Sequence, residues 1–294
     1  MSAKKDLALS QLIENLLVAR NPRGMKTIQS ALTPGYCLRA AKLMEKCRGS
    51  VLIATGFPVN DTFETDGPLG AIALYQALSK QGASPVLVCS NPLAAAIQND
   101  YQVYCLPVGR QRERNPMEQA QQVLDTYQPE LIITIELPGR AADGQYYNMR
   151  SEDISDRVIF FDDMMAAADC PTIGIGDGGN EVGMGKIVEA LSCLDITPCA
   201  TSCDELVIAD VSNWAAHGLV AMLSILSGKS LLDDWNNRCC LEYLVARGSV
   251  DGVTGEHTLT EDGLSCEVTD TVIAGLQQIV ESSCSASAIK KSHL

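Results

Sequence analysis

Basic residues are scarce in this sequence, and long apolar runs are absent from it. The 22 lysines and arginines are outnumbered by 36 aspartates and glutamates, which gives a formal net charge of −14 at pH 7 over 294 residues. Nucleic-acid binding through a broad basic surface is therefore not expected, because phosphate contacts need clustered positive charge. A transmembrane helix needs a run of about 18 apolar residues. No such run occurs, so no membrane partner is expected.

The residues that build several common catalytic and metal centres are also lacking. The twelve cysteines form no C-x-x-C pair, which argues against a structural zinc site of the usual spacing. Only three histidines occur, and no G-x-S-x-G motif is present on which a serine-hydrolase triad could be built. His217, which lies near the end of an expected strand, is interpreted as a packing residue.

The first 21 residues carry an amphipathic pattern. Their apolar residues recur at helical spacing and are interrupted by Asp6, Gln11, Glu14 and Asn15, and no small-residue cleavage site follows them. This pattern indicates a helix of the folded protein and not a signal peptide. No Arg- and Ser-rich transit segment is visible, so a cytoplasmic location is expected.

Short β-branched runs alternate with helical stretches along most of the chain. This alternation is typical of parallel strands joined by crossover helices. The expected fold class is α/β with three layers, in which a mostly parallel sheet carries helices on both faces. Strands are expected at 51–55, 85–90, 102–108, 131–137, 158–163, 172–177 and 205–210, and helices between them at 68–80, 92–99, 116–127, 181–194 and 213–226.

The two ends of the chain depart from this alternation. Residues 1–48 are expected to form an N-terminal helical segment, and residues 49–294 an α/β domain packed with it as one unit. Within that domain, the Gly-rich stretch 247–265 predicts a hairpin excursion, and a final helix is expected over 269–282. The sequence is also compatible with a homo-oligomer.

Acidic and amide side chains follow several of the expected strands. Glu64 and Asp66 follow the first strand, Glu136 lies in the fourth, Asp177 ends the sixth, and Asn213 follows the seventh. Ligands of open parallel sheets bind beyond the carboxyl ends of the strands, so these side chains are expected to share one site. The alternative interpretation is that they only cap helices and close turns.

The most informative segment is residues 172–186, TIGIGDGGNEVGMGK. Its glycine spacing formally matches a dinucleotide fingerprint, but Asp177 and Glu181 would put negative charge beside a pyrophosphate. A Walker loop also fails, because Ile187 replaces the hydroxyl residue that binds magnesium. No nucleotide cofactor is therefore expected. The grouped oxygens of Asp177, Asn180 and Glu181 suit Mg²⁺, Mn²⁺ or Ca²⁺, or the ammonium group of a small substrate.

A second polar segment spans residues 136–155, ELPGRAADGQYYNMRSEDIS. The planar fork of Arg140 makes it a candidate carboxylate clamp, and a surface salt bridge to Asp143 or Glu136 is the alternative. The expected partner is a small-molecule substrate. The candidate substrate-binding residues are Gly67, Arg140, Asp143, Asn148, Asn180, Lys186 and Asn213.

Four phrases of the sequence resemble one known family. They are ATGFPV…ETDGPLGAIAL (54–74), ELPGRAADGQYYNMRSEDIS (136–155), TIGIGDGGNEVGMGK (172–186) and IADVSNW (208–214). They closely resemble the D-glutamate cyclase-like domain family, long catalogued as a domain of unknown function and found at the C-terminal end of the mitochondrial D-glutamate cyclase of animals. The resemblance spans most of residues 25–280. It implies a lyase that converts D-glutamate into 5-oxo-D-proline and water.

The implied reaction needs a general base, an electrophile and an acid. The candidate catalytic residues are Glu136, Asp177 and Glu181, with the base and acid roles unassigned among them. In the version with a divalent cation, Glu64, Asp66, Asp177 and Glu181 are the ligands, and the cation polarises the γ-carboxylate. In the version without a cation, the same acids grip the substrate ammonium group. The alternative functions are a metal-dependent hydrolase such as a phosphatase, and a non-catalytic module that binds an amino acid or a cation.

Overall fold

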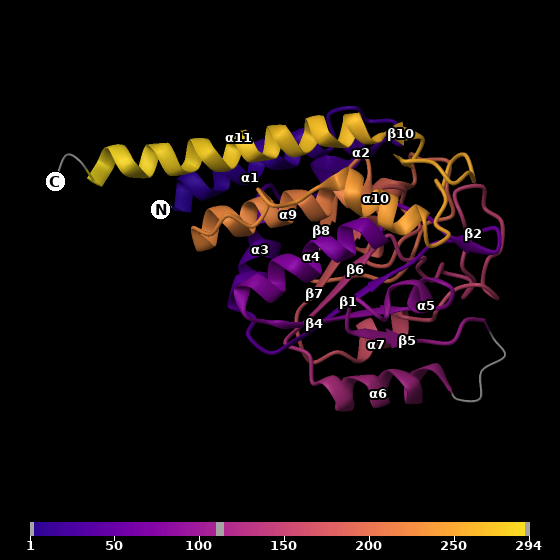
Figure 1. The fold of residues 1–294 in the computed structure, drawn as a ribbon. Helices are drawn as coiled ribbons and strands as arrows, with labels where there is room; N and C mark the ends of the chain where they lie inside the picture. Colours follow the sequence, from indigo (N-terminus) through magenta and orange to yellow (C-terminus); the bar gives the residue numbers. More distant parts are fainter. Residues whose placement is uncertain (1–2, 110–114, 292–294) are drawn as a thin grey trace.

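The centre of the molecule is a six-stranded parallel sheet. The computed structural model describes residues 3–109 and 115–291 of the chain. The strand order is β5-β4-β1-β6-β7-β8, so the chain moves outward from β1 in both directions, as in doubly wound folds (Figure 1). The strands are β1 (Ser50–Thr55), β4 (Ser84–Cys89), β5 (Val103–Cys105), β6 (Leu131–Ile135), β7 (Thr172–Gly176) and β8 (Glu205–Ile208).

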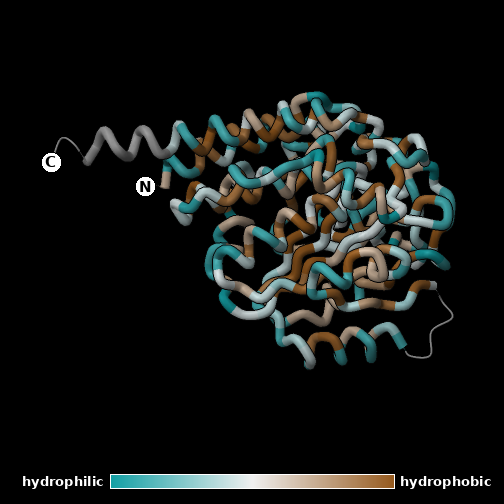
Figure 2. Tube along the Cα trace, in the orientation of Figure 1, coloured by the Kyte–Doolittle hydropathy of each residue, from teal (hydrophilic) through white to brown (hydrophobic). Residues whose placement is uncertain are grey.

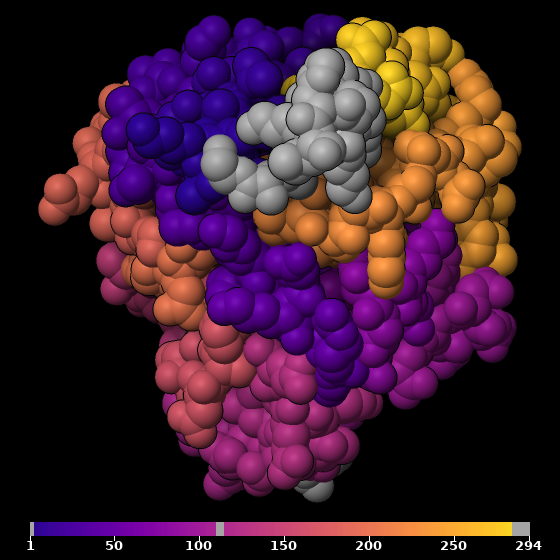
Figure 3. Space-filling model, turned by 90° about the vertical axis from the view of Figure 1, so that its left-hand side faces the viewer, coloured from indigo at the N-terminus to yellow at the C-terminus, as the bar shows by residue number. Residues whose placement is uncertain are grey.

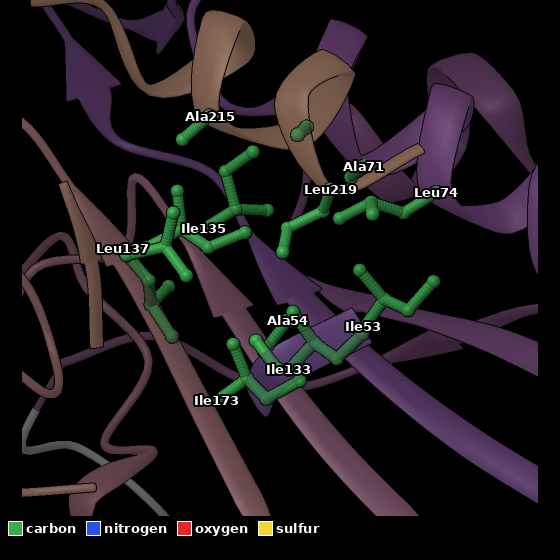
Figure 4. Close-up of a cluster of buried hydrophobic side chains, with 14 of the residues drawn as sticks. Ile53, Ala54, Ala71, Leu74, Ile133, Ile135, Leu137, Ile173, Ala215 and Leu219 are labelled. Carbon is green, nitrogen blue, oxygen red and sulfur yellow. The ribbon is translucent and has the colours of Figure 1, made fainter. Parts of the chain in front are cut away.

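The central strands are buried on both faces. Ile53 of β1 pairs with Ile133 of β6, which pairs with Ile173 of β7, and all three side chains are buried (Figure 4). This double burial explains why these strands appear in the sequence as continuous apolar runs and not as an alternating pattern. Figure 2 shows the same central strands as a strongly hydrophobic part of the trace.

Helices cover both faces of the sheet, which confirms the predicted three-layer α/β architecture. One face is covered by α3 (Tyr36–Lys46), α4 (Pro68–Gln81) and α9 (Ser212–Ser227). In Figure 4, Ala71 and Leu74 of α4 and Ala215 and Leu219 of α9 lie over the isoleucines of the strands. On the other side lie α6 (Pro116–Tyr127) and α7 (Asp162–Ala167), with α5 (Leu93–Ile97) beside β4 and β5 (Figure 1).

The N- and C-terminal helices add an outer layer on the α9 side. The helices α1 (Ala3–Leu17) and α11 (Cys266–Lys291) pack against each other and against α9 (Figures 1 and 3). Among the helices that the structure describes, none has the length and apolar character needed to cross a membrane. The shorter elements are α2 (Met25–Ile28), η1 (Gln29–Ala31), η2 (Gly185–Ile187), α8 (Val188–Leu191), α10 (Asn237–Val245), β2 (Pro58–Val59) and β3 (Thr62–Phe63).

The C-terminal hairpin is present as β9 (Thr260–Glu261) and β10 (Leu264–Ser265). The loop before it docks onto the segment that follows β1, where Thr65 N donates to Val250 O at 2.8 Å and Val250 N donates to Phe63 O at 3.0 Å. The hairpin lies within the predicted stretch 247–265, and the final helix, expected over 269–282, runs from Cys266 to Lys291. The hairpin also lies against the carboxyl edge of the sheet.

One predicted strand and one predicted helix are wrong. Residues 158–161 form no strand, and α7 begins at Asp162. Their apolar run arises because Val158, Ile159 and Phe161 are buried as a packed loop. The helix expected over 181–194 is reduced to η2 and α8, because Gly183 has a φ of 104° that a right-handed helix cannot accommodate.

Candidate active site

Side chains from four adjacent strand ends converge at the carboxyl edge of the sheet. Glu64 and Asp66 follow β1, Glu136 follows β6, Asp177 follows β7, and Asn213 lies in the first turn of α9 after β8. All five side chains are buried. Because β1, β6, β7 and β8 are consecutive neighbours in the sheet, their ends meet in one region of the molecule.

Asp66 joins the beginnings of two helices. Its Oδ1 atom accepts hydrogen bonds from Gly67 N at 2.9 Å and Asn213 N at 2.7 Å, and its Oδ2 atom accepts one from Ser212 N at 3.0 Å. The amides of Ser212 and Asn213 lie in the first turn of α9, where backbone N–H groups have no partner within the helix. Asp66 therefore caps α9 from a distant part of the chain.

Glu181 likewise accepts hydrogen bonds from backbone amides, in the turn after β7. Its carboxylate accepts hydrogen bonds from Gly178 N at 2.8 Å and Gly179 N at 2.7 Å. Asn180 donates from Nδ2 to Tyr147 O at 2.9 Å, which ties this turn to the second polar segment. These bonds fix the backbone that carries Asp177.

Glu136 stands at the end of β6 in a strained conformation. Its φ is 41°, in the left-handed region, which costs a non-glycine residue about 1–3 kcal/mol and is concentrated at functional sites. Ser212 Oγ donates a hydrogen bond to Glu136 Oε2 at 2.6 Å. The neighbouring Gly67 has a φ of 89°, and a Cβ atom there would lie 2.6 Å from Glu136 Cβ. Glycine is therefore required at position 67 for Glu136 to occupy this place.

Asn213 links the beginning of α4 to the C-terminal hairpin. Asn213 Oδ1 accepts hydrogen bonds from Gly67 N at 2.9 Å and Gly70 N at 2.7 Å. Its Nδ2 atom donates to Glu261 Oε2 of the C-terminal hairpin at 2.8 Å. Burial raises the pKa of Glu261 to about 7. The polar atoms of Asn213 are thus engaged in holding the loops together.

A residue that the sequence analysis did not select, Arg23, lies in the middle of the acidic groups. It comes from the loop between α1 and α2, and its Nη2 atom donates to Asp177 Oδ2 at 2.8 Å and to Asp262 Oδ2. Burial acts to lower the pKa of Arg23, but Asp177 and Glu136 outweigh burial and hold the pKa above its ordinary value. Arg23 is therefore a cation held within the acidic cluster.

The site opens into a cavity of about 330 Å³. Three arginines line it, namely Arg23, Arg150 and Arg157. Glu64 and Glu136 also line the cavity. The other lining residues are Phe57, Pro58, Val59, Asn60, Asn148, Met149, Glu152, Gly252, Val253 and Asp262.

Of the seven substrate-binding residues expected from sequence, only Asn148 lines this cavity, and Gly67, Asn180 and Asn213 are engaged in the loops described above. Arg140 pairs with Asp163 and not with Asp143 or Glu136, the alternatives considered from sequence. Lys186 donates to backbone carbonyl oxygens of Cys203 and Asp204, and Asp143 is exposed and accepts a hydrogen bond from a tyrosine.

Burial raises the pKa values of the carboxyl groups at the centre of the site. The pKa values of Glu64, Glu136 and Asp177 lie well above their ordinary values, first because of burial and then because neighbouring carboxylates repel additional negative charge. Arg23 opposes this effect at Asp177. Burial also raises the pKa of Asp66, although the amides of Asn213 and Ser212 favour its ionised form. The cluster thus holds carboxyl groups that keep a proton to higher pH than an ordinary carboxyl group does.

Some carboxylate oxygen atoms of the cluster could coordinate a hard cation. Two triads have carboxylate oxygens within 4.8 Å of one another, namely Asp66, Asp177 and Asp262, and Glu136, Asp177 and Glu181. Backbone amides already bind Asp66 and Glu181, as described above. By contrast, Glu64 Oε1 and Asp177 Oδ1 are buried and have no hydrogen-bond partner among the described residues. Carboxylate oxygens are the donors that Mg²⁺ or Mn²⁺ prefers, and Asp177 belongs to both triads. Glu64, which the sequence also suggested as a ligand, belongs to neither triad.

The raised pKa of Glu64 predicts that Glu64→Gln becomes more stable than the wild type as pH rises. An unfolded Glu64 loses its proton near the ordinary pKa of 4.5, whereas the folded protein keeps that proton to higher pH. The contribution of Glu64 to wild-type stability therefore falls with rising pH above about pH 4.5, by at most about 1.4 kcal/mol per pH unit for one proton. Glutamine does not titrate, so the variant escapes this loss.

Urea denaturation between about pH 4.5 and pH 8.5, with EDTA present, measures the difference. The matched control is Glu152→Gln, because Glu152 is an exposed acid that lines the same cavity. Its stability curve should run parallel to the wild-type curve. A Glu64→Gln curve that also runs parallel would show that Glu64 ionises normally in the folded protein.

Comparisons with known proteins agree with the family resemblance predicted from the sequence. A sequence profile of the family described as "D-glutamate cyclase-like, C-terminal" matches residues 13–277. The human protein named "D-glutamate cyclase, mitochondrial" is 37% identical over 251 residues, which cover 75% of this chain and 40% of the human protein. The chain therefore spans less than half the length of that relative.

Among solved structures, an exopolyphosphatase-related protein from Bacteroides fragilis matches with a TM-score of 0.43 and 13% sequence identity, covering 84% of this chain and 57% of that one. A likeness at this level carries no argument about function. The family profile spans β1 to β10 and every strand end that contributes to the site. The chain belongs to the D-glutamate cyclase-like family, as a member matching its C-terminal domain.

Proposed function

We propose that this chain is a lyase that converts D-glutamate into 5-oxo-D-proline and water. The observation that carries the proposal is the position of Glu136, a buried and strained carboxyl group with a raised pKa that faces a cavity lined by three arginines. The name of the human relative supplies the substrate and reaction class. A dicarboxylate amino acid needs positive charge for its carboxylates and a base for its ammonium group.

The chemistry of ring closure matches what Glu136 offers. The ammonium nitrogen must lose a proton before it can attack the γ-carboxyl carbon, and Glu136 accepts this proton. A second proton leaves the nitrogen as the lactam forms, and one γ-oxygen departs as water with both protons. Because a carboxyl group with a raised pKa is a stronger base than an ordinary carboxylate, Glu136 can take the proton from nitrogen and pass it to the departing oxygen.

The other acids of the cluster have supporting roles in this proposal. Asp177 is bound to Arg23, so it fixes the position of that guanidinium. Asp66 and Glu181 are bound to backbone amides and shape the loops. Asp177, which belongs to both triads, would contribute its unpartnered oxygen to a divalent cation, and such a cation would supply polarisation of the γ-carboxylate.

The test follows ring closure by proton NMR after the purified chain is mixed with D-glutamate, L-glutamate or 5-oxo-D-proline. Each reaction is run with Mg²⁺ or Mn²⁺ and again after EDTA treatment. We expect D-glutamate to cyclise. Turnover that survives EDTA in a protein free of bound cation would remove the cation from the proposal and leave the acid–base part.

A chain that turns over no substrate under any of these conditions would contradict the proposed reaction. Binding should then be measured separately, because a rise in melting temperature with D-glutamate would still locate a ligand site. In that case the non-catalytic amino-acid-binding module becomes the better description of the chain.

A further inference from the structure

Three aspartates from distant parts of the chain meet at the carboxyl edge of the sheet. Asp66 follows β1, Asp177 follows β7, and Asp262 lies in the turn of the C-terminal hairpin. Each offers one carboxylate oxygen, and these three oxygens lie within 4.8 Å of one another. Hard oxygen donors grouped in this way are the ligands that Mg²⁺ and Mn²⁺ prefer in proteins.

The guanidinium group of Arg23 binds two of these three aspartates through one nitrogen atom. Its Nη2 atom donates to Asp177 Oδ2 at 2.8 Å and to Asp262 Oδ2. The third aspartate shares a backbone amide with Asp177, because Ser212 N lies 3.0 Å from Asp66 Oδ2 and 3.1 Å from Asp177 Oδ2. The positive charge of Arg23 therefore lies against the oxygens that a metal ion would need.

The loop that carries Arg23 is itself held in place. Asp210, just after β8, accepts hydrogen bonds through its carboxylate from Arg20 N at 2.7 Å and Asn21 N at 3.1 Å. The backbone oxygen of Asp210 accepts a further hydrogen bond from Arg23 Nη2 at 3.4 Å. A cation tethered in this way has a high effective concentration at its site, so a free ion has to compete with it.

The guanidinium group does not satisfy all the carboxylate oxygens around it. Asp177 Oδ1 and Glu64 Oε1 are buried and accept no hydrogen bond from any described residue. Glu64 lies next to Asp262, because a Cβ atom on Gly252 would meet the carboxylates of both. Buried carboxylate oxygens without a partner are costly, and coordination to a metal ion would engage them.

We propose that Asp66, Asp177 and Asp262 form a divalent-cation site in which the guanidinium group of Arg23 takes the place of the ion. Arg23 and the ion are alternatives, because both need the oxygens of Asp177 and Asp262. The site therefore binds Mg²⁺ or Mn²⁺ weakly while Arg23 is present and tightly when its charge is removed. This inference goes beyond the proposed function and does not depend on it, because cation binding is measured without substrate.

Titration calorimetry with Mn²⁺ tests the inference on protein that has been treated with EDTA and then freed of it. Arg23→Gln removes the competing charge and keeps a polar side chain. The tightest Mn²⁺ site of this variant should have a dissociation constant at least about 10-fold below that of the tightest site in the wild type. Saturating Mn²⁺ should also raise the melting temperature of the variant more than that of the wild type.

Two comparisons locate the new site. Arg150→Gln is the matched control for charge, because Arg150 is exposed and lines the same cavity, and this variant should bind Mn²⁺ as the wild type does. Adding Asp262→Asn to Arg23→Gln removes a proposed ligand and should abolish the gain. Adding Glu152→Gln to Arg23→Gln removes an exposed acid that lines the cavity outside the triad, so the gain should remain.

Several results would overturn the inference. One is an Arg23→Gln variant that binds Mn²⁺ no more tightly than the wild type. Another is a gain that survives Asp262→Asn, and a third is an equal gain in Arg150→Gln, which would reflect only the charge of the cavity.

Folding of the variants is judged by circular dichroism, with and without Mn²⁺. Arg23→Met, which has no charge and a long side chain, repeats the test if Arg23→Gln does not fold. If neither variant folds even with Mn²⁺ present, the ion cannot replace Arg23 and the inference fails. None of these outcomes depends on whether the chain cyclises D-glutamate, so the proposed function stands or falls by its own test.

Discussion

Replacing Glu136 by glutamine is expected to lower kcat by about 10²- to 10⁴-fold, the contribution usually made by a positioned general base. The amide oxygen of glutamine can still accept the hydrogen bond that Ser212 Oγ donates, so the side chain should keep its place. It cannot take a proton from the substrate ammonium group. The loss should therefore appear in turnover and not in folding or ligand binding.

NMR of D-glutamate consumption measures kcat, and the melting temperature reports whether the variant is folded. Asp143→Asn is the matched control, because Asp143 is an acid in the same polar segment that is exposed and absent from the cavity lining. Its turnover should match that of the wild type. A Glu136→Gln variant that retains most of the wild-type kcat would exclude Glu136 as the base.

The sequence was sufficient to predict the sheet because the central strands bury both faces. Runs such as residues 131–135 are apolar except for the buried Thr134, and acids that directly follow such runs must lie at the carboxyl edge of the sheet. Glu136 and Asp177 could be selected on this basis. The same logic failed at residues 158–161, because burial of a loop produces the same apolar pattern as burial of a strand.

Arg23 could not be selected by that logic. Its approach to Asp177 spans 154 positions and its approach to Asp262 spans 239, and no periodic pattern encodes contacts between loops. The sequence around these residues indicates only turns. Asn21 and Gly24, on either side of Arg23, have positive φ angles, and Asp262 has a φ of 53° in the hairpin turn. Such signals place a residue in a loop but do not say where the loop docks.

Arg140, in contrast, was selected from the sequence but does not line the cavity. Its residue type and its neighbours suggested a carboxylate clamp, but a carboxylate of the protein itself, that of Asp163, already binds it. Asp163 lies in the segment that was predicted as a strand. Because residues 158–163 were wrongly predicted as a strand, Asp163 was not considered as the ion-pair partner of Arg140.

Asp66→Ala is expected to lower the free energy of unfolding by about 1–3 kcal/mol. The substitution leaves the buried amide of Asn213 without its acceptor, and water cannot readily replace it. The amides of Gly67 and Ser212 lose one of two acceptors and keep Asn213 Oδ1 and Asp177 Oδ2. The amides of Ser212 and Asn213 begin α9, the helix that packs against α3, α4 and α11. Loss of this cap should therefore weaken the packing of α9 against these three helices.

Urea denaturation in EDTA distinguishes this capping role from the role of a metal ligand, which the sequence also suggested for Asp66. Asp61→Ala serves as the control, because Asp61 is an exposed acid in the same segment and its loss should change stability by less than about 0.5 kcal/mol. A cap is needed whether or not a cation is bound, so the loss in Asp66→Ala should persist in EDTA. If Asp66→Ala is instead as stable as the wild type in EDTA and less stable only when Mg²⁺ or Mn²⁺ is added, Asp66 is a ligand, and the two helices must be joined by other contacts.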